Sequence, residues 1–168
     1  MNAYGVWHFS FTVSDLEAAI SFYVDLLGFE LVHRQVQDND YTRRLVGYDD
    51  AVLEVAQLAA PGQTRGMSTH DLELVHYRSP AGRLLPTEIR DPGQAHLALA
   101  VADADAVHAR LSAAGIRFVT PPNAITAGIN AGGRACYFFG PDGAVHELVE
   151  PPPARRAAWD DQRAGGSR

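Results

Sequence analysis

Two stretches decide the fold, namely His8-Phe-Ser-Phe-Thr-Val-Ser-Asp15 and His96-Leu-Ala-Leu-Ala-Val-Ala-Asp103. Each alternates in side-chain character as a half-buried strand does, and each ends on an aspartate suited to the N-cap of a following helix. Amphipathic helix patterns follow both stretches and stop at Gly28 and Gly115. The sequence therefore predicts that one structural unit occurs twice.

Further strand patterns complete each copy. They lie at residues 29–36, 51–58 and 71–77 in the first copy and at 116–120, 134–139 and 144–149 in the second. Pro141-Asp142-Gly143 predicts a tight hairpin turn between the last two strands. The first copy also carries an insertion at 39–50, where we expect a loop or a short helix. The predicted fold class is α+β, with two tandem βαβββ modules forming a cupped mixed sheet.

The expected division of the chain follows from this repeat and from the positions of proline. We assign residues 1–78 to the first module, 79–94 to a linker with three prolines and 95–150 to the second module. Residues 151–168 open with three prolines and end in Gly-Gly-Ser-Arg, which predicts a flexible tail or a packing arm.

Composition excludes several classes of function. The 168 residues are 46% hydrophobic, which is enough for a globular core, and a net charge of −6 argues against nucleic acid as a partner. The apolar runs are too short to cross a membrane and the N-terminus lacks a signal pattern, so we expect a soluble cytoplasmic protein. The single cysteine, in Cys136-Tyr-Phe-Phe, excludes an internal disulfide and is expected to be a buried, inert thiol.

Strand alternation places four polar residues at equivalent positions of the repeat. His8 shares a face with Ser10 and Thr12, opposite the aromatic face expected under the helix, and His96 opens the matching strand. The last strand of each copy holds a central glutamate, Glu73 and Glu147. A single strand histidine or glutamate is usually a solvated residue, but a solvated face has no reason to repeat the same donors.

Two imidazoles and two carboxylates suit one divalent metal ion, such as Mn, Co, Ni, Fe(II) or Zn. We therefore predict a metal site built from His8, Glu73, His96 and Glu147 within the cup of the sheet. The other histidines are expected to lie away from the metal site. The pattern places His76 and His146 on the faces opposite the glutamates, and it predicts surface positions for His33, His70 and His108.

The chain resembles the vicinal oxygen chelate superfamily over roughly residues 4 to 151. The likeness rests on the two histidine strands, on Leu-Glu-Leu-Val-His at residues 72–76 and on the closing Phe-Gly-Pro-Asp-Gly-Ala-Val-His-Glu-Leu at residues 139–148. That superfamily includes glyoxalase I, methylmalonyl-CoA epimerase, extradiol dioxygenases and bleomycin-resistance proteins. The resemblance implies that the same four residues are the metal ligands.

Several reactions fit such a site. Four protein ligands leave fewer open positions than an extradiol dioxygenase uses, and metal-free binding proteins of the superfamily typically lack the ligands. Glu73 is similar to the glutamate of glyoxalase I, a lyase. In epimerases of the family a glutamate in a strand like 51–58 acts as a base, and Glu54 matches it. The alternative for Glu54 is a carboxylate on an edge strand that faces water.

The sequence thus predicts a metal-dependent isomerase, most like an epimerase, that moves an α-proton next to a carbonyl through a metal-stabilised enolate. Glu54 would take the proton, and Glu147 or a bound water would return one on the other face. A glyoxalase-type lyase is the close alternative, followed by a dioxygenase or a metal-free small-molecule-binding protein. We expect a small carbonyl compound as substrate and, by resemblance, a homodimer.

Overall fold

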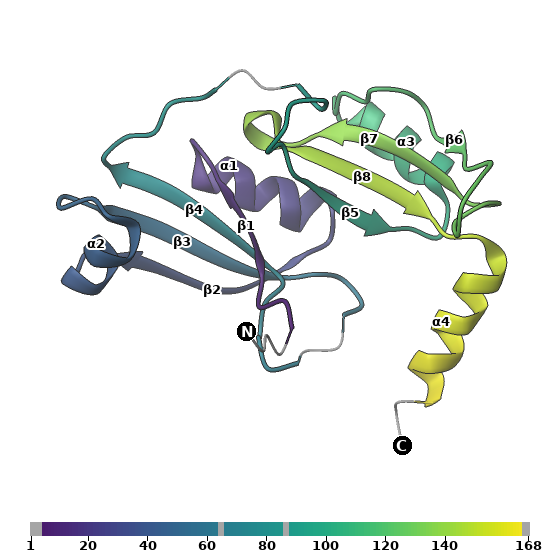
Figure 1. The fold of residues 1–168 in the computed structure, drawn as a ribbon, viewed down its shortest axis with the longest axis horizontal. Helices are drawn as coiled ribbons and strands as arrows, with labels where there is room; N and C mark the ends of the chain where they lie inside the picture. Colours follow the sequence, from purple (N-terminus) through teal and green to yellow (C-terminus); the bar gives the residue numbers. More distant parts are fainter. Residues whose placement is uncertain (1–4, 64–65, 86–87, 166–168) are drawn as a thin grey trace. The chain divides into compact units, whose positions relative to one another are not determined.

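The computed structural model describes residues 5–63, 66–85 and 88–165 (Figure 1). The chain divides into two compact units, Met1–Thr87 and Glu88–Arg168. The division falls inside the segment 79–94 that the sequence assigns to a linker. None of the helices in the described ranges is long and apolar enough to cross a lipid bilayer.

The first module is a four-stranded mixed sheet with helices. Its elements are β1 (Phe9–Thr12), α1 (Leu16–Ser21) continued by a π-helical turn (Phe22–Leu26), β2 (Glu30–Gln37), α2 (Asp40–Val46), β3 (Val52–Ala59) and β4 (Leu72–Ser79). The strand order is β1-β4-β3-β2, with β1 parallel to β4 and the other neighbours antiparallel. The helix α2 confirms the short helix expected in the insertion.

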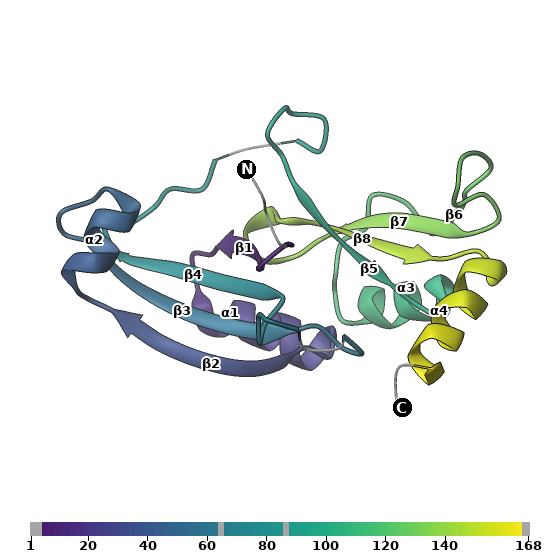
Figure 2. The ribbon, with the colours of Figure 1, turned by 60° about the horizontal axis from the view of Figure 1, so that its bottom comes forward.

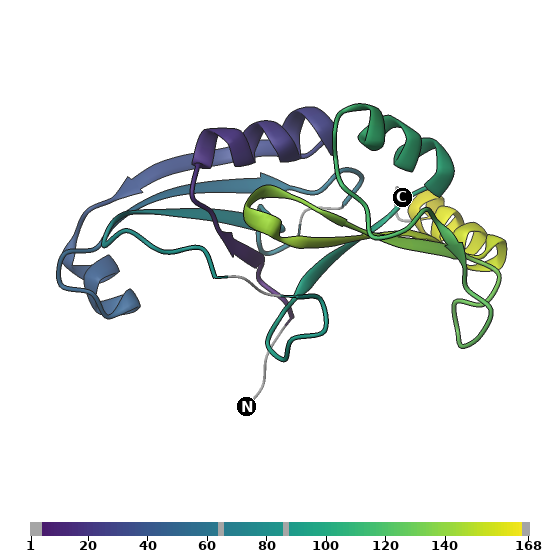
Figure 3. The same ribbon diagram turned by 90° about the horizontal axis from the view of Figure 1, so that it is seen from above.

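Helix α1 covers one face of this sheet (Figure 3). It begins at Asp15, whose side chain accepts a hydrogen bond from the Ala18 amide at 3.0 Å, and the helical segment ends at Gly28, whose φ is +76°. The strand residues beneath the helix are fully or almost fully buried, among them Leu58, Leu72 and Leu74. Gln57 and Glu73, which pair directly on β3 and β4, lie on the opposite face of the sheet.

The second module repeats this plan. It contains β5 (His96–Ala100), α3 (Ala104–Ala113), β6 (Asn123–Ala124), β7 (Arg134–Phe139), a 3-10 turn (Pro141–Gly143), β8 (Val145–Glu150) and α4 (Pro153–Gly165). Its strand order, β5-β8-β7-β6, corresponds position by position to that of the first module. Helix α3 lies on one face of this sheet (Figure 2) and is capped by Asp103, which accepts from the Ala106 amide at 2.9 Å. The α+β fold of two βαβββ modules is confirmed.

One expectation for the second module differs from the structure. The predicted strand at 116–120 forms only an isolated bridge, Phe118 to Phe138, and the prolines at 121 and 122 interrupt any longer pairing with β7. The segment 151–168, expected to be a flexible tail or a packing arm, contains helix α4, and the Arg156 guanidinium donates to the Ala102 carbonyl at 2.9 Å.

Candidate metal centre

The register of the first sheet brings His8 and Glu73 to the same face. Ser10 pairs with Glu73 across β1 and β4, and His8 lies two residues before Ser10 on the chain. On the other side of β4, Gln57 of β3 pairs directly with Glu73. Because side chains alternate along a strand, all of these residues point away from helix α1.

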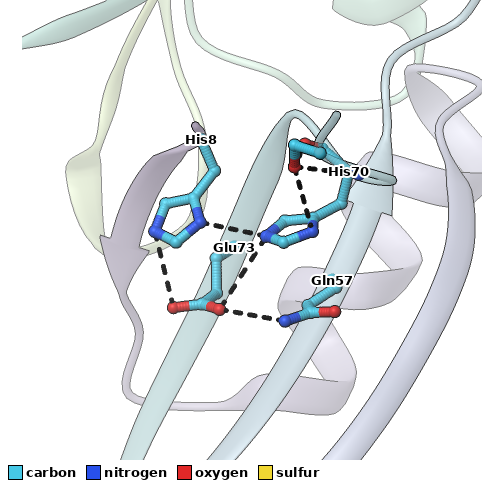
Figure 4. Close-up of polar contacts among 5 residues, drawn as sticks. His8, Gln57, His70 and Glu73 are labelled. Carbon is cyan, nitrogen blue, oxygen red and sulfur yellow. Dashed lines mark hydrogen bonds and ion pairs between the residues drawn. The ribbon is translucent and has the colours of Figure 1, made fainter. Parts of the chain in front are cut away.

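His8, His70 and Glu73 form a cluster that could hold a metal ion (Figure 4). His8 Nε2 lies 3.8 Å from Glu73 Oε1, and His8 Nδ1 lies 3.0 Å from His70 Nε2. His70 Nε2 is in turn 4.0 Å from Glu73 Oε2. One potential ligand atom from each residue falls within 4.8 Å of the other two.

His70 is a part of this cluster that the sequence did not indicate. The prediction of a surface position is wrong, because only 5% of the residue is exposed. Burial, and next the neighbouring His8, lower the pKa of the His70 imidazole. His70 is therefore a neutral ring at neutral pH, with one donor and one acceptor nitrogen.

Gln57 holds the carboxylate of the cluster from the opposite side. Its amide Nε2 donates to Glu73 Oε2 at 3.3 Å. One carboxylate oxygen of Glu73 thus faces the Gln57 amide while the other faces His8 (Figure 4). Such a partner limits the orientations that a ligating carboxylate can take.

The second module has the equivalent pair. Ala98 pairs with Glu147 across β5 and β8, as Ser10 pairs with Glu73, and His96 lies two residues before Ala98. His96 Nε2 is 3.3 Å from Glu147 Oε2. Each module therefore brings one imidazole and one carboxylate together at the same place in its own sheet.

Tyr137 adjoins the His96–Glu147 pair. It lies opposite Glu147 across β7 and β8, and its ring meets the His96 ring edge-on with centroids 5.3 Å apart. Burial, and next the Glu147 carboxylate, raise the pKa of the Tyr137 hydroxyl. Tyr137 thus stays protonated at neutral pH and can donate a hydrogen bond beside the pair.

The structure does not bring Glu54 together with the predicted ligands of its module. Glu54 pairs with His76 across β3 and β4, three residues from Gln57, and so lies on the face opposite Glu73. Its carboxylate forms ion pairs with Arg78 and, at 3.8 Å, with Arg34. The catalytic role predicted for Glu54 stays a prediction without support from this geometry.

His76 and His146 occupy the helix-side faces that strand alternation predicts. His76 Nδ1 donates to the Val13 carbonyl at 3.1 Å. His146 is fully buried, stacks on Phe138 with ring centroids 5.0 Å apart and donates from Nδ1 to the Ala144 carbonyl at 3.0 Å. The His76 ring therefore points away from Glu73, and the His146 ring points away from Glu147.

The donors at each pair fit a divalent cation. Imidazole nitrogen and carboxylate oxygen are the ligands that mid-row divalent metals take in proteins. His8, Glu73 and Glu147 are partly buried, whereas His96 is exposed over 42% of its side chain. In the first module the supporting contacts of Gln57 and His70 are of the kind that orient metal ligands.

Comparison with known proteins identifies the family. The model of the glyoxalase/bleomycin resistance protein/dioxygenase superfamily matches residues 5–148, and the chain belongs to this superfamily. The chain is also 36% identical over 155 residues to a 2-epi-5-epi-valiolone epimerase from Actinomyces sp., covering 90% of this chain and 81% of that protein. One relative at this level of similarity is thus an epimerase.

Solved structures share the fold. A glyoxalase family protein from Bacillus cereus superposes with a TM-score of 0.73 at 24% identity, covering 90% of this chain and 97% of its own. A fosfomycin resistance protein from Listeria monocytogenes, solved with Mn(II) and sulfate, has a TM-score of 0.57 at 17% identity and covers 93% and 99% of the two chains. A protein that shares this fold has thus been solved with a divalent metal ion.

Proposed function

We propose that the protein is a metal-dependent epimerase that inverts a carbon atom next to a carbonyl group. The observation that carries this proposal is the repeated pair, His8 with Glu73 and His96 with Glu147, at equivalent positions of two matching sheets. The 36% identity to an epimerase supports the choice among the reactions of the superfamily.

The residues of these pairs are the proposed ligands of a divalent ion. A bound ion of this kind acts as a Lewis acid, which polarises a carbonyl oxygen and makes the proton on the adjacent carbon more acidic. The chain contributes the donors and their orientation. Gln57 restrains the Glu73 carboxylate through its 3.3 Å hydrogen bond, so that Glu73 keeps one oxygen toward His8.

Glu147 is the proposed residue for proton transfer. Its carboxylate has two oxygens, so one can serve as a ligand while the other accepts or returns a proton. Tyr137 lies across the strand pair from Glu147 and keeps its own proton, because burial and the Glu147 charge raise its pKa. The Tyr137 hydroxyl is therefore placed to donate a hydrogen bond near the reacting group.

The proposed substrate class is a small hydroxylated ketone. The Actinomyces relative is named for its action on 2-epi-5-epi-valiolone, whose ending denotes a ketone. A ketone supplies both the oxygen that a metal ion binds and an adjacent acidic C–H bond. Inversion at that carbon requires removal of the proton from one face and delivery of a proton, from a second group or a water molecule, to the opposite face.

Metal analysis and deuterium exchange together test this function. Purified protein is expected to hold one mid-row divalent ion per chain and to exchange the α-proton of a hydroxylated ketone with D₂O, as followed by proton NMR. Chelation should abolish the exchange, and Mn, Co or Ni should restore it. Glu147→Gln should lower exchange about 100-fold or more, while Glu30→Gln, at an exposed position on β2, serves as the matched control.

Two results would overturn the proposal. One is the absence of stoichiometric metal with no binding of added Mn, Co or Ni, which would favour the metal-free binding protein. The other is a metal-loaded protein that catalyses no exchange with any hydroxylated ketone but consumes oxygen with a catechol, which would favour the dioxygenase.

A further inference from the structure

The two ring nitrogens of His8 face different partners. Nε2 faces the Glu73 carboxylate at 3.8 Å, and Nδ1 lies 3.0 Å from His70 Nε2 (Figure 4). A neutral imidazole carries its proton on one nitrogen only, so the partner of Nδ1 decides whether Nε2 has a free lone pair. A histidine can bind a metal ion only through a nitrogen without a proton.

Ser68 fixes the donor and acceptor roles of His70. The Ser68 hydroxyl donates to the His70 carbonyl at 2.6 Å. Its single proton is then used, and the same oxygen accepts from the His70 amide at 3.3 Å and faces His70 Nδ1 at 3.5 Å. Only a protonated Nδ1 suits that oxygen, so His70 Nε2 is the acceptor nitrogen.

One assignment of protons satisfies the contacts among Ser68, His70 and His8. The Ser68 hydroxyl donates to the His70 carbonyl, His70 Nδ1–H donates to Ser68 Oγ, and His8 Nδ1–H donates to His70 Nε2. His8 Nε2 is left without a proton on the side of Glu73. Because His70 is 5% exposed, water does not readily replace it as the partner of His8.

We infer that His70, oriented by Ser68, is a positioning residue that holds His8 in the Nδ1–H tautomer and so keeps His8 Nε2 ready to bind the metal ion. This inference rests on the proposed metal site. The arrangement belongs to the first module, because Ala144 stands three residues before Glu147, where the first module has His70 before Glu73. The two halves of the repeat therefore orient their histidines by different means.

The geometry favours this role over that of a third ligand. His70 Nε2 faces His8 Nδ1 at 3.0 Å, so an ion held between these two nitrogens would bind His8 through Nδ1. His8 Nε2, the nitrogen facing Glu73 at 3.8 Å, would then be unused. A hydrogen bond between the rings instead leaves Nε2 and the Glu73 carboxylate on the same side.

Nitrogen NMR of histidine-labelled protein reads the tautomer directly. In the wild-type protein stripped of metal, the long-range ¹⁵N–¹H pattern of His8 should show a protonated Nδ1 and a bare Nε2. His70→Ala should produce a mixture of tautomers at His8. A wild-type His8 with its proton on Nε2 would overturn the inference, whatever the protein's metal content or activity.

Metal affinity supplies the second readout. His70→Ala should weaken Co(II) binding about 10- to 100-fold in a competition titration with a chromophoric chelator. His70→Gln should recover most of that loss, because its amide oxygen can accept from His8 Nδ1–H, and Ser68→Ala should cause a smaller loss. His76→Gln, on the opposite face of the same strand region, is the matched control.

The two readouts separate failure of this inference from failure of the proposed function. A Zn(II)-loaded spectrum in which a His70 nitrogen is itself metal-bound would overturn the positioning role and leave the enzyme proposal standing. A protein with the expected His8 tautomer that binds no metal would overturn the proposed function instead. If His70→Ala does not fold, the wild-type spectrum and the Ser68→Ala titration still decide.

Discussion

Gln57 and Glu73 occupy directly paired positions on β3 and β4, and the Gln57 amide donates to Glu73 Oε2 at 3.3 Å. The pairing lies on the face that His8 shares, so Glu73 is held between an amide and an imidazole. Any function that uses the Glu73 carboxylate therefore depends on Gln57 for its orientation.

Gln57→Leu should weaken metal binding about 10-fold or more, the size of effect expected when a ligand loses its hydrogen-bonding partner. Leucine has a similar volume and keeps the packing of β3, so the fold should persist. Isothermal titration with Co(II) measures the change. Gln35→Leu, placed on the same face by its pairing with Val55, should bind Co(II) as the wild type does. Equal affinities of the two variants would contradict this role.

Glu54→Gln should leave deuterium exchange of the substrate within about twofold of the wild-type rate. Glu54 lies on the helix-side face with Arg78 and Arg34, where its loss removes ion pairs with two partly exposed arginines. Such pairs contribute about 0.2–1 kcal/mol to the free energy of unfolding. Urea denaturation should show a loss in that range. A large fall in exchange, with the stability unchanged, would instead support Glu54 as the base.

The repeat explains why much of the site could be predicted from sequence. Strand alternation alone places His8 with Ser10 and Thr12, and the same pattern at His96 gives the second imidazole. In the structure His8 lies beside Glu73 and His96 lies beside Glu147, each pair within its own module. Each of these pairs lies within two neighbouring strands, and the alternation of side chains along those strands brings the two residues to one face.

The role of Glu54 shows where alternation stops being sufficient. The sequence tells which residues of β3 share a face, but the pairing with β4 decides which of those faces carries Glu73. The register between these strands places Gln57, not Glu54, opposite Glu73. A slip of one residue would exchange the two faces, and the connection between β3 and β4 is longer than the hairpin loops whose turn type fixes the register.

His70 was missed for a related reason. It precedes β4, so its direction follows the turn at Ser68 rather than strand alternation. Its burial depends on long-range packing against His8, 62 residues earlier in the chain. Ser68-Thr69-His70 lies in a connector without the period of a helix or a strand. The sequence therefore predicts neither the direction nor the burial of the His70 side chain.

His146 should make the stability of the protein fall with decreasing pH. The ring is fully buried, and burial lowers its pKa from 6.5 to about 4, so the unfolded chain takes up a proton that the folded chain excludes. Stability is unaffected by this group above pH 6.5 and falls as the pH drops toward 4, by about 3 kcal/mol in all.

His146→Leu, a change of similar volume, tests this dependence. Urea denaturation of metal-free wild-type and variant proteins at several pH values between about 7 and 4.5 gives the difference in unfolding free energy. That difference should move in favour of the variant as the pH falls. Parallel pH profiles for the two proteins would show that His146 is not the responsible group.

Cys136 should be unreactive in the folded protein. Its thiol is buried on β7, and burial, with the nearby Glu147 and Asp105 carboxylates, raises its pKa. A disulfide reagent such as DTNB should label no thiol under native conditions and one per chain in guanidinium chloride. Fast labelling of the native protein would mean that this strand opens readily to solvent.

Gly133→Ala should destabilise the second module. Gly133 immediately precedes β7, and a Cβ atom there would lie 2.4 Å from the Glu150 carbonyl oxygen and 3.2 Å from that of Asn130. Backbone atoms cannot swing aside as a flexible side chain can, so the start of the β7–β8 pairing must shift. We expect a loss of about 2 kcal/mol in the free energy of unfolding and a Tm lower by about 4 to 8 °C.

Gly82→Ala is the matched control for this substitution, because no atom lies within 4 Å of the position that the alanine methyl group would take and the φ of Gly82 is not positive. Its Tm should stay within about 1 °C of the wild-type value. Hydrogen exchange locates the effect: amides of β7 and β8 should exchange faster in Gly133→Ala, while those of β3 and β4 should not. Equal loss of protection in both modules would mean that they unfold as one cooperative unit, and unchanged stability would mean that the segment before β7 relaxes without cost.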